Sequence, residues 1–247
     1  MSDIILEARD LGMRFGRFQA LANVSTRFRR GELCAIIGPN GAGKSTFFNI
    51  LSGSLAPTSG SVLFRGEDVT ALPQHAYARL GIAKSFQITN VFRQLSAREN
   101  VRVAAQMRAT RFDFLRPRSA WPELTDKADA LLEGVGLANV RERTAADLAH
   151  GQQRALEIAM ALAADPQLLL LDEPTAGMSP EETTAMMDLI AHLATERTVI
   201  LVEHKMKMVM GLCRRLLVLH HGELLADGTP ESIRANDEVR RVYLGQG

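Results

Sequence analysis

The residues best suited to chemistry form a glycine-rich stretch that directly follows an apolar run. Residues 38–45 read GPNGAGKS and fit the pattern GxxxxGK[ST] at every defined position. Glycines let backbone N–H groups converge on phosphate oxygens, a lysine in this place reaches the β- and γ-phosphates, and a serine hydroxyl binds magnesium. A glycine turn of purely structural use is the alternative. The apolar run before the stretch and the helix-compatible residues 46–51 after it favour a phosphate site at a helix N-terminus.

This stretch also predicts which groups hold the phosphates of a nucleoside triphosphate. We expect Lys44 to contact the β- and γ-phosphates and Ser45 to ligate magnesium. The full set of residues that we expect around the phosphates is Gly38, Pro39, Asn40, Gly41, Ala42, Gly43, Lys44, Ser45 and Thr46.

A pair of carboxylates follows a second apolar run, residues 168–171. Asp172 and Glu173 stand where a parallel strand would end, which is the edge at which α/β sheets place their ligands. We expect Asp172 to hold the magnesium shell and Glu173 to orient, or take a proton from, the water that attacks the γ-phosphate. An apolar run that ends in Asp-Glu is common by itself, and it gains meaning from the phosphate-binding stretch in the same chain.

The elements that must position these residues are predicted by the apolar pattern. Alternation over residues 4–8 and 24–28 predicts half-buried antiparallel strands, whereas the continuous apolar runs 33–37, 168–171 and 199–202 predict buried strands. Helical patterns separate the three buried strands, so the fold class should be α/β with a largely parallel sheet.

The middle and the end of the chain differ from this pattern. From about residue 89 to 147 the strand signals disappear and residues 97–107 and 125–134 read as helices, which predicts an inserted helical lobe. Residues 216–219 and 224–226 predict a hairpin close to the end. We therefore expect one domain over residues 1–247, in which 1–88 and 148–247 form the α/β core with a β-subdomain.

Composition excludes several classes of protein. The 247 residues are 46% hydrophobic, which excludes disorder, and 29 Lys+Arg against 28 Asp+Glu leave a net charge of +1. That balance and the 5% of aromatic residues disfavour a protein that wraps nucleic acid. No apolar run reaches the length of a membrane span. Cys34 and Cys213 lie in apolar stretches without metal-ligand spacing, so we expect buried free thiols.

The segment between the two phosphate motifs carries a family resemblance. Residues 148–154 read LAHGQQR, which resembles the LSGGQ signature of the ATP-binding cassette (ABC) ATPases. Phe15, Gln87, the sequence Glu173-Pro174-Thr175 and His204 follow in the order of that family's other motifs. The resemblance covers almost the whole chain and implies a P-loop NTPase fold of the ABC nucleotide-binding type, with an antiparallel β-subdomain and a helical subdomain.

The resemblance implies a set of roles around ATP and Mg2+. In this family two subunits enclose two ATP molecules, and each signature segment faces the nucleotide of the other subunit. Phe15 would stack on the adenine, and Ala149, Gly151 and Gln152 would bind the nucleotide from across a dimer formed with a second copy or a paralogous ATPase subunit. The implied catalytic residues are Glu173, His204, Gln87 and Lys44, and the implied magnesium ligands are Ser45, Gln87 and Asp172.

The chain departs from the family pattern at three positions. Ala149 replaces a serine whose hydroxyl commonly contacts the γ-phosphate, and His150 replaces a glycine. The amide of Gly151 and the helix N-terminus would still supply donors, so we expect closure of the dimer to survive. Ser179 stands where the family often has an aspartate. The sequence SPEE at residues 179–182 is also a good helix start, with a capping residue and a proline after it.

Within the family, the chain looks like the ATP-binding subunits of branched-chain amino-acid importers. This resemblance rests on residues 148–154, on the sequence EHKM at 203–206 and on the sequence VYLG at 242–245. It implies transmembrane permease subunits as partners, indirectly a periplasmic or extracellular substrate-binding protein, no nucleic acid, and a peripheral place on the cytoplasmic face of the inner (plasma) membrane.

Other functions share parts of this pattern. Urea or amide importers and the ATPase of lipopolysaccharide export have many of the same motifs. A soluble ABC ATPase that acts on DNA or ribosomes is disfavoured, because such proteins typically have two cassettes or long coiled coils and this chain shows no sustained heptads. The arginine-rich residues 108–122 are either a solvated loop or a surface for a partner, and the sequence leaves both open.

Overall fold

A six-stranded, mostly parallel sheet forms the centre of the computed structural model, which describes residues 3–85, 91–109 and 121–243. Its strand order is β10-β9-β3-β8-β7-β6. These strands are β3 (Leu33–Ile37), β6 (Ile82–Ser85), β7 (Leu168–Asp172), β8 (Thr198–Val202), β9 (Arg215–His220) and β10 (Glu223–Gly228). Every neighbouring pair is parallel except β9 and β10, which form an antiparallel hairpin. The predicted α/β class and the three buried strands are confirmed.

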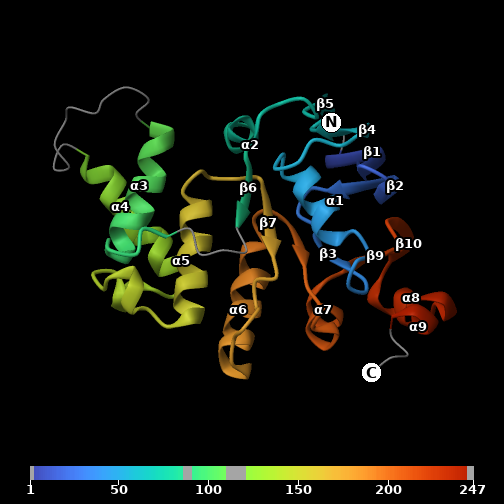
Figure 1. The fold of residues 1–247 in the computed structure, drawn as a ribbon. Helices are drawn as coiled ribbons and strands as arrows, with labels where there is room; N and C mark the ends of the chain where they lie inside the picture. The colour runs from blue at the N-terminus through green and yellow to red at the C-terminus, as the bar shows by residue number, and fades with distance from the viewer. Residues whose placement is uncertain (1–2, 86–90, 110–120, 244–247) are drawn as a thin grey trace.

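A four-stranded antiparallel sheet packs against the central sheet, with helix α1 between them (Figure 1). Its strands are β1 (Ile4–Phe15), β2 (Phe18–Arg29), β4 (Ser59–Phe64) and β5 (Glu67–Asp68), in the order β2-β1-β4-β5. The expected antiparallel strands at the start of the chain are confirmed, and they are longer than the alternating residues indicated.

The central strands are apolar along their whole length because both of their faces are covered. Successive side chains of a strand point to opposite faces. In β3, Cys34 and Ile36 pack into the core shared with α1 and the antiparallel sheet, whereas Leu33, Ala35 and Ile37 pack into the core on the other face. Cys34 and Cys213 are buried free thiols, as the sequence predicts, and burial raises the pKa of both.

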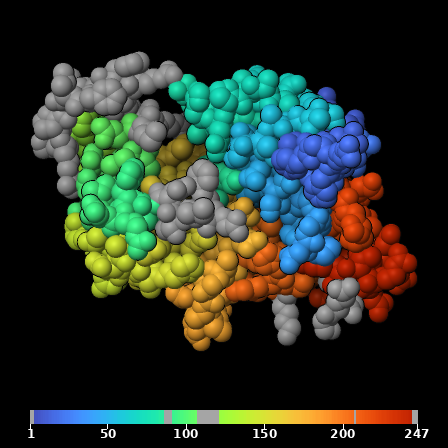
Figure 2. Space-filling model, viewed as in Figure 1, coloured from blue at the N-terminus to red at the C-terminus, as the bar shows by residue number. Residues whose placement is uncertain are grey.

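The helices surround the central sheet and extend it to one side (Figures 1 and 2). The α-helices are α1 (Lys44–Leu51), α2 (Gln74–Leu80), α3 (Ala97–Ala109), α4 (Pro122–Gly134), α5 (His150–Leu162), α6 (Pro180–Leu193), α7 (Met206–Leu212), α8 (Pro230–Ala235) and α9 (Asp237–Val242). Two short 3-10 helices, η2 (Ala138–Val140) and η3 (Ala145–Asp147), lie between α4 and α5. Within the described part of the chain, no helix combines the length and the apolar character needed to cross a membrane.

Helices α3 and α4 pack against each other and against α5 at the end of the molecule opposite the antiparallel sheet (Figure 1). The two predicted helices in this region are confirmed, and both are longer than predicted. The division of the chain into a core and a helical lobe stays a prediction. Most of the arginine-rich segment lies outside the described residues, because the description ends at residue 109 and resumes at 121.

Ser179 caps helix α6, as the sequence SPEE predicts. Its Oγ accepts a hydrogen bond from the Glu182 N–H at 3.2 Å, and Glu182 Oε2 accepts one from the Ser179 N–H at 3.0 Å. Pro180 occupies the first helical turn, where its missing N–H costs no hydrogen bond.

The buried side chain of Asn100 ties residues 92–96 to helix α3. Its Oδ1 accepts from the Phe92 N–H at 2.7 Å, and its Nδ2 donates to the carbonyl oxygens of Phe92 at 3.1 Å and Ser96 at 2.9 Å. These bonds satisfy backbone groups that belong to no regular element, so this one side chain defines the path of the segment.

We expect Asn100→Ala to lower the free energy of unfolding by about 2 to 4 kcal/mol, because it leaves buried backbone groups without partners. Urea denaturation at equilibrium measures the change. The exposed neighbour Gln94 supplies the control, and Gln94→Ala should stay within about 0.5 kcal/mol of the original protein. A similar small effect of Asn100→Ala would contradict the role given to this side chain.

Candidate functional site

A cavity of about 240 Å3 lies where the loop after β3 meets the ends of β7 and β8. It is lined by residues 40–46, Phe18, Ala20, Glu173 and His204. The structure thus brings together residues that are more than 150 positions apart in sequence, and it places most of the predicted phosphate stretch around one hollow. Gly38 and Pro39, which begin the stretch, are not among the lining residues.

The loop needs glycine at two places where another backbone comes too close for a side chain. At Gly38, with φ +147°, an added Cβ would lie 2.1 Å from the carbonyl oxygen of Leu219. At Gly43, with φ +96°, it would lie 2.8 Å from the carbonyl oxygen of Ala20. Helix α1 begins directly after Gly43, so its free N–H groups face the cavity and favour an anion there.

The Lys44 ammonium is held inside this loop by the loop itself. Nζ donates to the carbonyl oxygens of Gly38 at 2.7 Å and Pro39 at 2.9 Å, and the residue is only 7% exposed. Burial lowers the pKa of Lys44 because it removes water from the charged form, while Glu173 opposes that shift. The loop therefore contains a cation positioned among backbone donors, which is a suitable place for a polyphosphate.

Two carboxylates at the end of β7 lie in different environments. Asp172 is 6% exposed, and burial raises its pKa, with the charge of Lys84 acting in the opposite direction. Glu173 follows with a backbone φ of +47°, an uncommon conformation for a residue with a side chain, and its N–H donates to the Val202 carbonyl at 2.9 Å. That conformation accompanies the placement of Glu173 in the cavity lining.

Glu173 and His204 lie together in the cavity, as their motif order predicts. Glu173 Oε2 is 3.0 Å from His204 Nε2, and the side chain of His204 is half exposed. This pair joins the end of β7 to the segment after β8. A water held beside Glu173 would therefore contact a carboxylate and an imidazole from two different strands.

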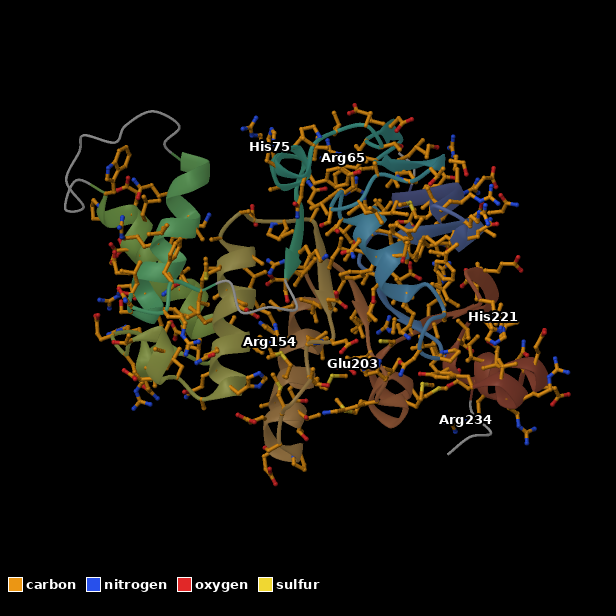
Figure 3. All side chains as sticks on the ribbon, in the orientation of Figure 1. Arg65, His75, Arg154, Glu203, His221 and Arg234 are labelled. Atoms are coloured by element: carbon orange, nitrogen blue, oxygen red, sulfur yellow. The ribbon has the colours of Figure 1, made fainter. Side chains whose placement is uncertain are left out.

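Glu203 supports this pair from behind and was not singled out by the sequence analysis. It is 1% exposed and lies at the end of β8 (Figure 3). Oε1 accepts from the N–H of Thr175 at 3.1 Å and from its hydroxyl, and Oε2 accepts from the His204 N–H at 3.0 Å. Glu203 thus fixes the segments after Glu173 and before His204 relative to each other. A carboxylate directly after an apolar strand was the available signal.

The signature residues line a different hollow. Helix α5 begins at His150, and Gly151 and Gln152 line a groove of about 450 Å3 between α4, α5 and α6. The Ala149 N–H donates to Gln152 Oε1 at 3.1 Å. Within one chain the structure does not bring these residues to the cavity at the phosphate loop, so a role for them there requires a second chain.

Two further predicted residues are placed as follows. Phe15 is 50% exposed and is not among the residues that line the cavity, whereas Phe18, its partner across the β1–β2 hairpin, is among them. The sequence FGRF at residues 15–18 predicts a two-residue turn, and that signal could have identified Phe18. Gln87 lies outside the described residues.

Comparisons with known proteins agree with this geometry. The profile of the ABC transporter family matches residues 21–176, and that of the branched-chain amino acid ATP-binding cassette transporter family matches residues 223–247. The chain is 42% identical to the "high-affinity branched-chain amino acid transport ATP-binding protein LivG" of Salmonella typhimurium, over 100% of both chains.

Solved structures share the fold over nearly the whole chain. The ADP conformation of the ATP-binding cassette MJ1267 has a TM-score of 0.87 at 27% identity and covers 99% of this chain and 100% of its own. A dimeric post-hydrolysis state of the cassette MJ0796, bound to ADP and Pi, has a TM-score of 0.78 at 25% identity and covers 92% of this chain and 99% of its own.

We expect ATP to raise the Tm of the protein through the contacts of Lys44. At about 100 times Kd the shift should be about 5 to 10 °C, because binding to the folded state alone then contributes about 2.7 kcal/mol. Lys44→Ala should abolish most of the shift, whereas Lys127→Ala, which changes an exposed lysine on α4, should keep it. Differential scanning fluorimetry measures Tm. Equal shifts in the two variants would show that Lys44 does not contact the nucleotide.

Proposed function

Because the chain belongs to the ABC transporter family, we propose that it is the ATPase subunit of an importer for branched-chain amino acids. It is an ATP-binding cassette that couples ATP hydrolysis to transport. The observation that carries the catalytic part is the cavity in which the phosphate loop, Glu173 and His204 meet. The substrate class is supported by the name of the LivG relative and by the match of residues 223–247 to the branched-chain family.

The residues divide the work of hydrolysis between binding and water activation. The loop N–H groups and Lys44 hold the β- and γ-phosphates and balance their charge. Glu173 orients the attacking water and accepts its proton, and His204, 3.0 Å from Glu173, contacts the γ-phosphate on the same side. Glu203 acts through its neighbours and keeps these two groups at a fixed separation.

The oxygen ligands near the loop fit Mg2+. Asp172 is a buried carboxylate without a printed cation in contact, and the hydroxyl of Ser45 lines the cavity. Among the described residues no group of three His, Cys, Asp or Glu side chains could hold a metal ion. Magnesium that arrives with a nucleotide needs no such group, since it keeps several waters and takes phosphate oxygens. We propose Ser45, Asp172 and Gln87 as its protein ligands, and the ion would neutralise phosphate charge.

A dimer completes the site. The distance between the cavity and the signature groove within one chain is the reason, because Ala149, Gly151 and Gln152 line or border a separate hollow. In a head-to-tail dimer of two cassettes, the N-terminus of α5 of one subunit would face the phosphate loop of the other. The dimeric state of the related cassette MJ0796 supports this arrangement.

The membrane partner would dock beside residues 92–95. Phe92 is 53% exposed and Leu95 is 37% exposed, and both belong to the segment that Asn100 holds in place. Arg93 lies exposed between them. An apolar surface with a cation, close in sequence to Gln87, fits a short helix of a permease subunit. The chain would then lie peripherally on the cytoplasmic face of the membrane, with a substrate-binding protein on the other side.

We expect Glu173→Gln to keep ATP binding and to lower the rate of hydrolysis by about 100-fold or more, because it removes the group that takes the proton. An ATP-bound dimer should accumulate, which size-exclusion chromatography with light scattering detects. Glu123→Gln, which neutralises an exposed carboxylate on α4, is the matched control and should hydrolyse ATP normally. Near-normal turnover of Glu173→Gln would refute the role given to Glu173.

We expect Phe92→Ser and Arg93→Ser to lower the amount of permease recovered with the tagged protein by about fivefold or more, as loss of a central interface contact does. Arg240→Ser, an exposed cation on α9, is the control.

The same recovered complex tests the substrate. Its binding protein should capture leucine, isoleucine or valine, identified by mass spectrometry. Capture of urea or an amide, or a complex without a binding protein, would contradict the proposed substrate. Unchanged permease recovery across the Phe92 and Arg93 variants would place the docking surface elsewhere.

A further inference from the structure

The amide that the proposed function assigns to the γ-phosphate already has an anionic partner within the same chain. The Gly151 N–H donates to Glu182 Oε1 at 3.1 Å, while Oε2 of the same carboxylate accepts from the Ser179 N–H at 3.0 Å. These two backbone bonds hold the pKa of Glu182 below its usual value. Glu182 is therefore an ionised carboxylate placed at the N-terminus of α5.

The approach of Glu182 depends on the absence of a side chain at Gly151. A Cβ added there would lie 2.8 Å from Glu182 Oε1 and 3.1 Å from its Cδ. Gly151 belongs to α5 and Glu182 belongs to the first turn of α6, and these two helices pack side by side (Figure 1). One carboxylate thus connects the signature segment to the helix that follows the catalytic Glu173.

A γ-phosphate and this carboxylate compete for the same donor. The Gly151 N–H carries a single hydrogen, and the free N–H groups of a helix N-terminus favour one anion at a time. A phosphate brought within hydrogen-bond distance of Gly151 would also lie close to Glu182, and two like charges in a site that closure dries repel strongly. Glu182 must therefore leave the amide when the nucleotide of a second subunit arrives.

The structure provides space into which the carboxylate can move. Glu182 and Gly151 both line the groove of about 450 Å3, whose other walls include Ala185, Leu189 and His192. The groove is open to solvent beside Glu182, so a change of side-chain rotamer would rehydrate the carboxylate without moving the backbone of α6. His150, whose charge would lower the pKa of Glu182, lies next to Gly151 and remains a nearby partner for the displaced anion.

We propose that Glu182 is an internal competitor of ATP at the signature segment, and that it raises the ATP concentration at which the two cassettes close. This inference rests on the proposed function, since it requires Gly151 to face the nucleotide of a partner subunit. Glu182 is a positioning residue: it touches neither the nucleotide nor the reacting water, and it acts by occupying the Gly151 amide until the phosphate displaces it.

The test uses the full chain in the Glu173→Gln background, in which the closed dimer accumulates. The dimer fraction is measured by light scattering against ATP concentration. Glu182→Gln keeps an oxygen for the Ser179 N–H and removes the charge, so we expect half-maximal dimer at about threefold less ATP. Glu182→Ala removes the competing acceptor, and we expect about tenfold less ATP, which is the size of a charged hydrogen bond expressed as a ratio.

A matched control separates competition from helix capping. Ser179→Ala removes the other half of the same cap of α6 but leaves Glu182 on Gly151, so its half-maximal ATP concentration should stay within about twofold of the parent. In the background with Glu173 intact, Glu182→Gln should lower KM for ATP more than it changes kcat. Loss of a purely structural contact would lower kcat or raise KM.

The outcomes are distinct. An unchanged or higher ATP requirement in both Glu182 variants overturns this inference, and so does an equal decrease in Ser179→Ala. If the Glu173→Gln parent itself forms no ATP-dependent dimer, the proposed function fails instead.

Discussion

The close approach of three backbones around the phosphate loop is the constraint on which the rest of the structure depends. The Gly222 N–H donates to the Ala42 carbonyl at 3.1 Å, and the Gly222 carbonyl accepts from the Ala22 N–H at 2.9 Å. The loop is thereby fixed between the β9–β10 turn and strand β2, which belong to the two different sheets. Because folding of both sheets is needed to form these bonds, the loop acquires its shape only in the complete fold, and it is then rigid before any phosphate binds.

Three carboxylates at the strand ends differ in how they are satisfied, and this difference sorts their roles. Glu203 is buried and accepts hydrogen bonds from Thr175 and His204, so it is suited to structure and not to proton transfer. Asp172 is buried, and the rise in its pKa shows that its charge is poorly compensated, which favours a cation beside it. Glu173 is partly exposed in the cavity, where it can contact water. One sheet edge thus provides a support, a cation ligand and a base.

The sequence predicted the parts of the site that depend on local order. The glycine pattern, the carboxylates after β7 and the Ser179 cap are all read from residues within a few positions of each other, where spacing determines geometry. Phe18, Glu203 and the contact of Glu182 with Gly151 were missed. Each joins segments brought together by tertiary folding, such as residues 28 to 31 positions apart, and neither composition nor periodicity reports such contacts.

The departures at the signature segment gain a physical account from these contacts. Ala149 supplies no hydroxyl, so Gly151 and the other N–H groups at the start of α5 become the donors that remain for a phosphate. His150 packs against the segment after Thr175, since its Cε1 would lie 3.4 Å from a Cβ added at Gly177. The signature segment is therefore joined to the segment after Glu173 by a ring contact at His150 and by the carboxylate of Glu182. Fewer side-chain donors to the nucleotide and more contacts within the chain both shift the balance toward the open state, and the loop at Lys44 must supply the compensating affinity.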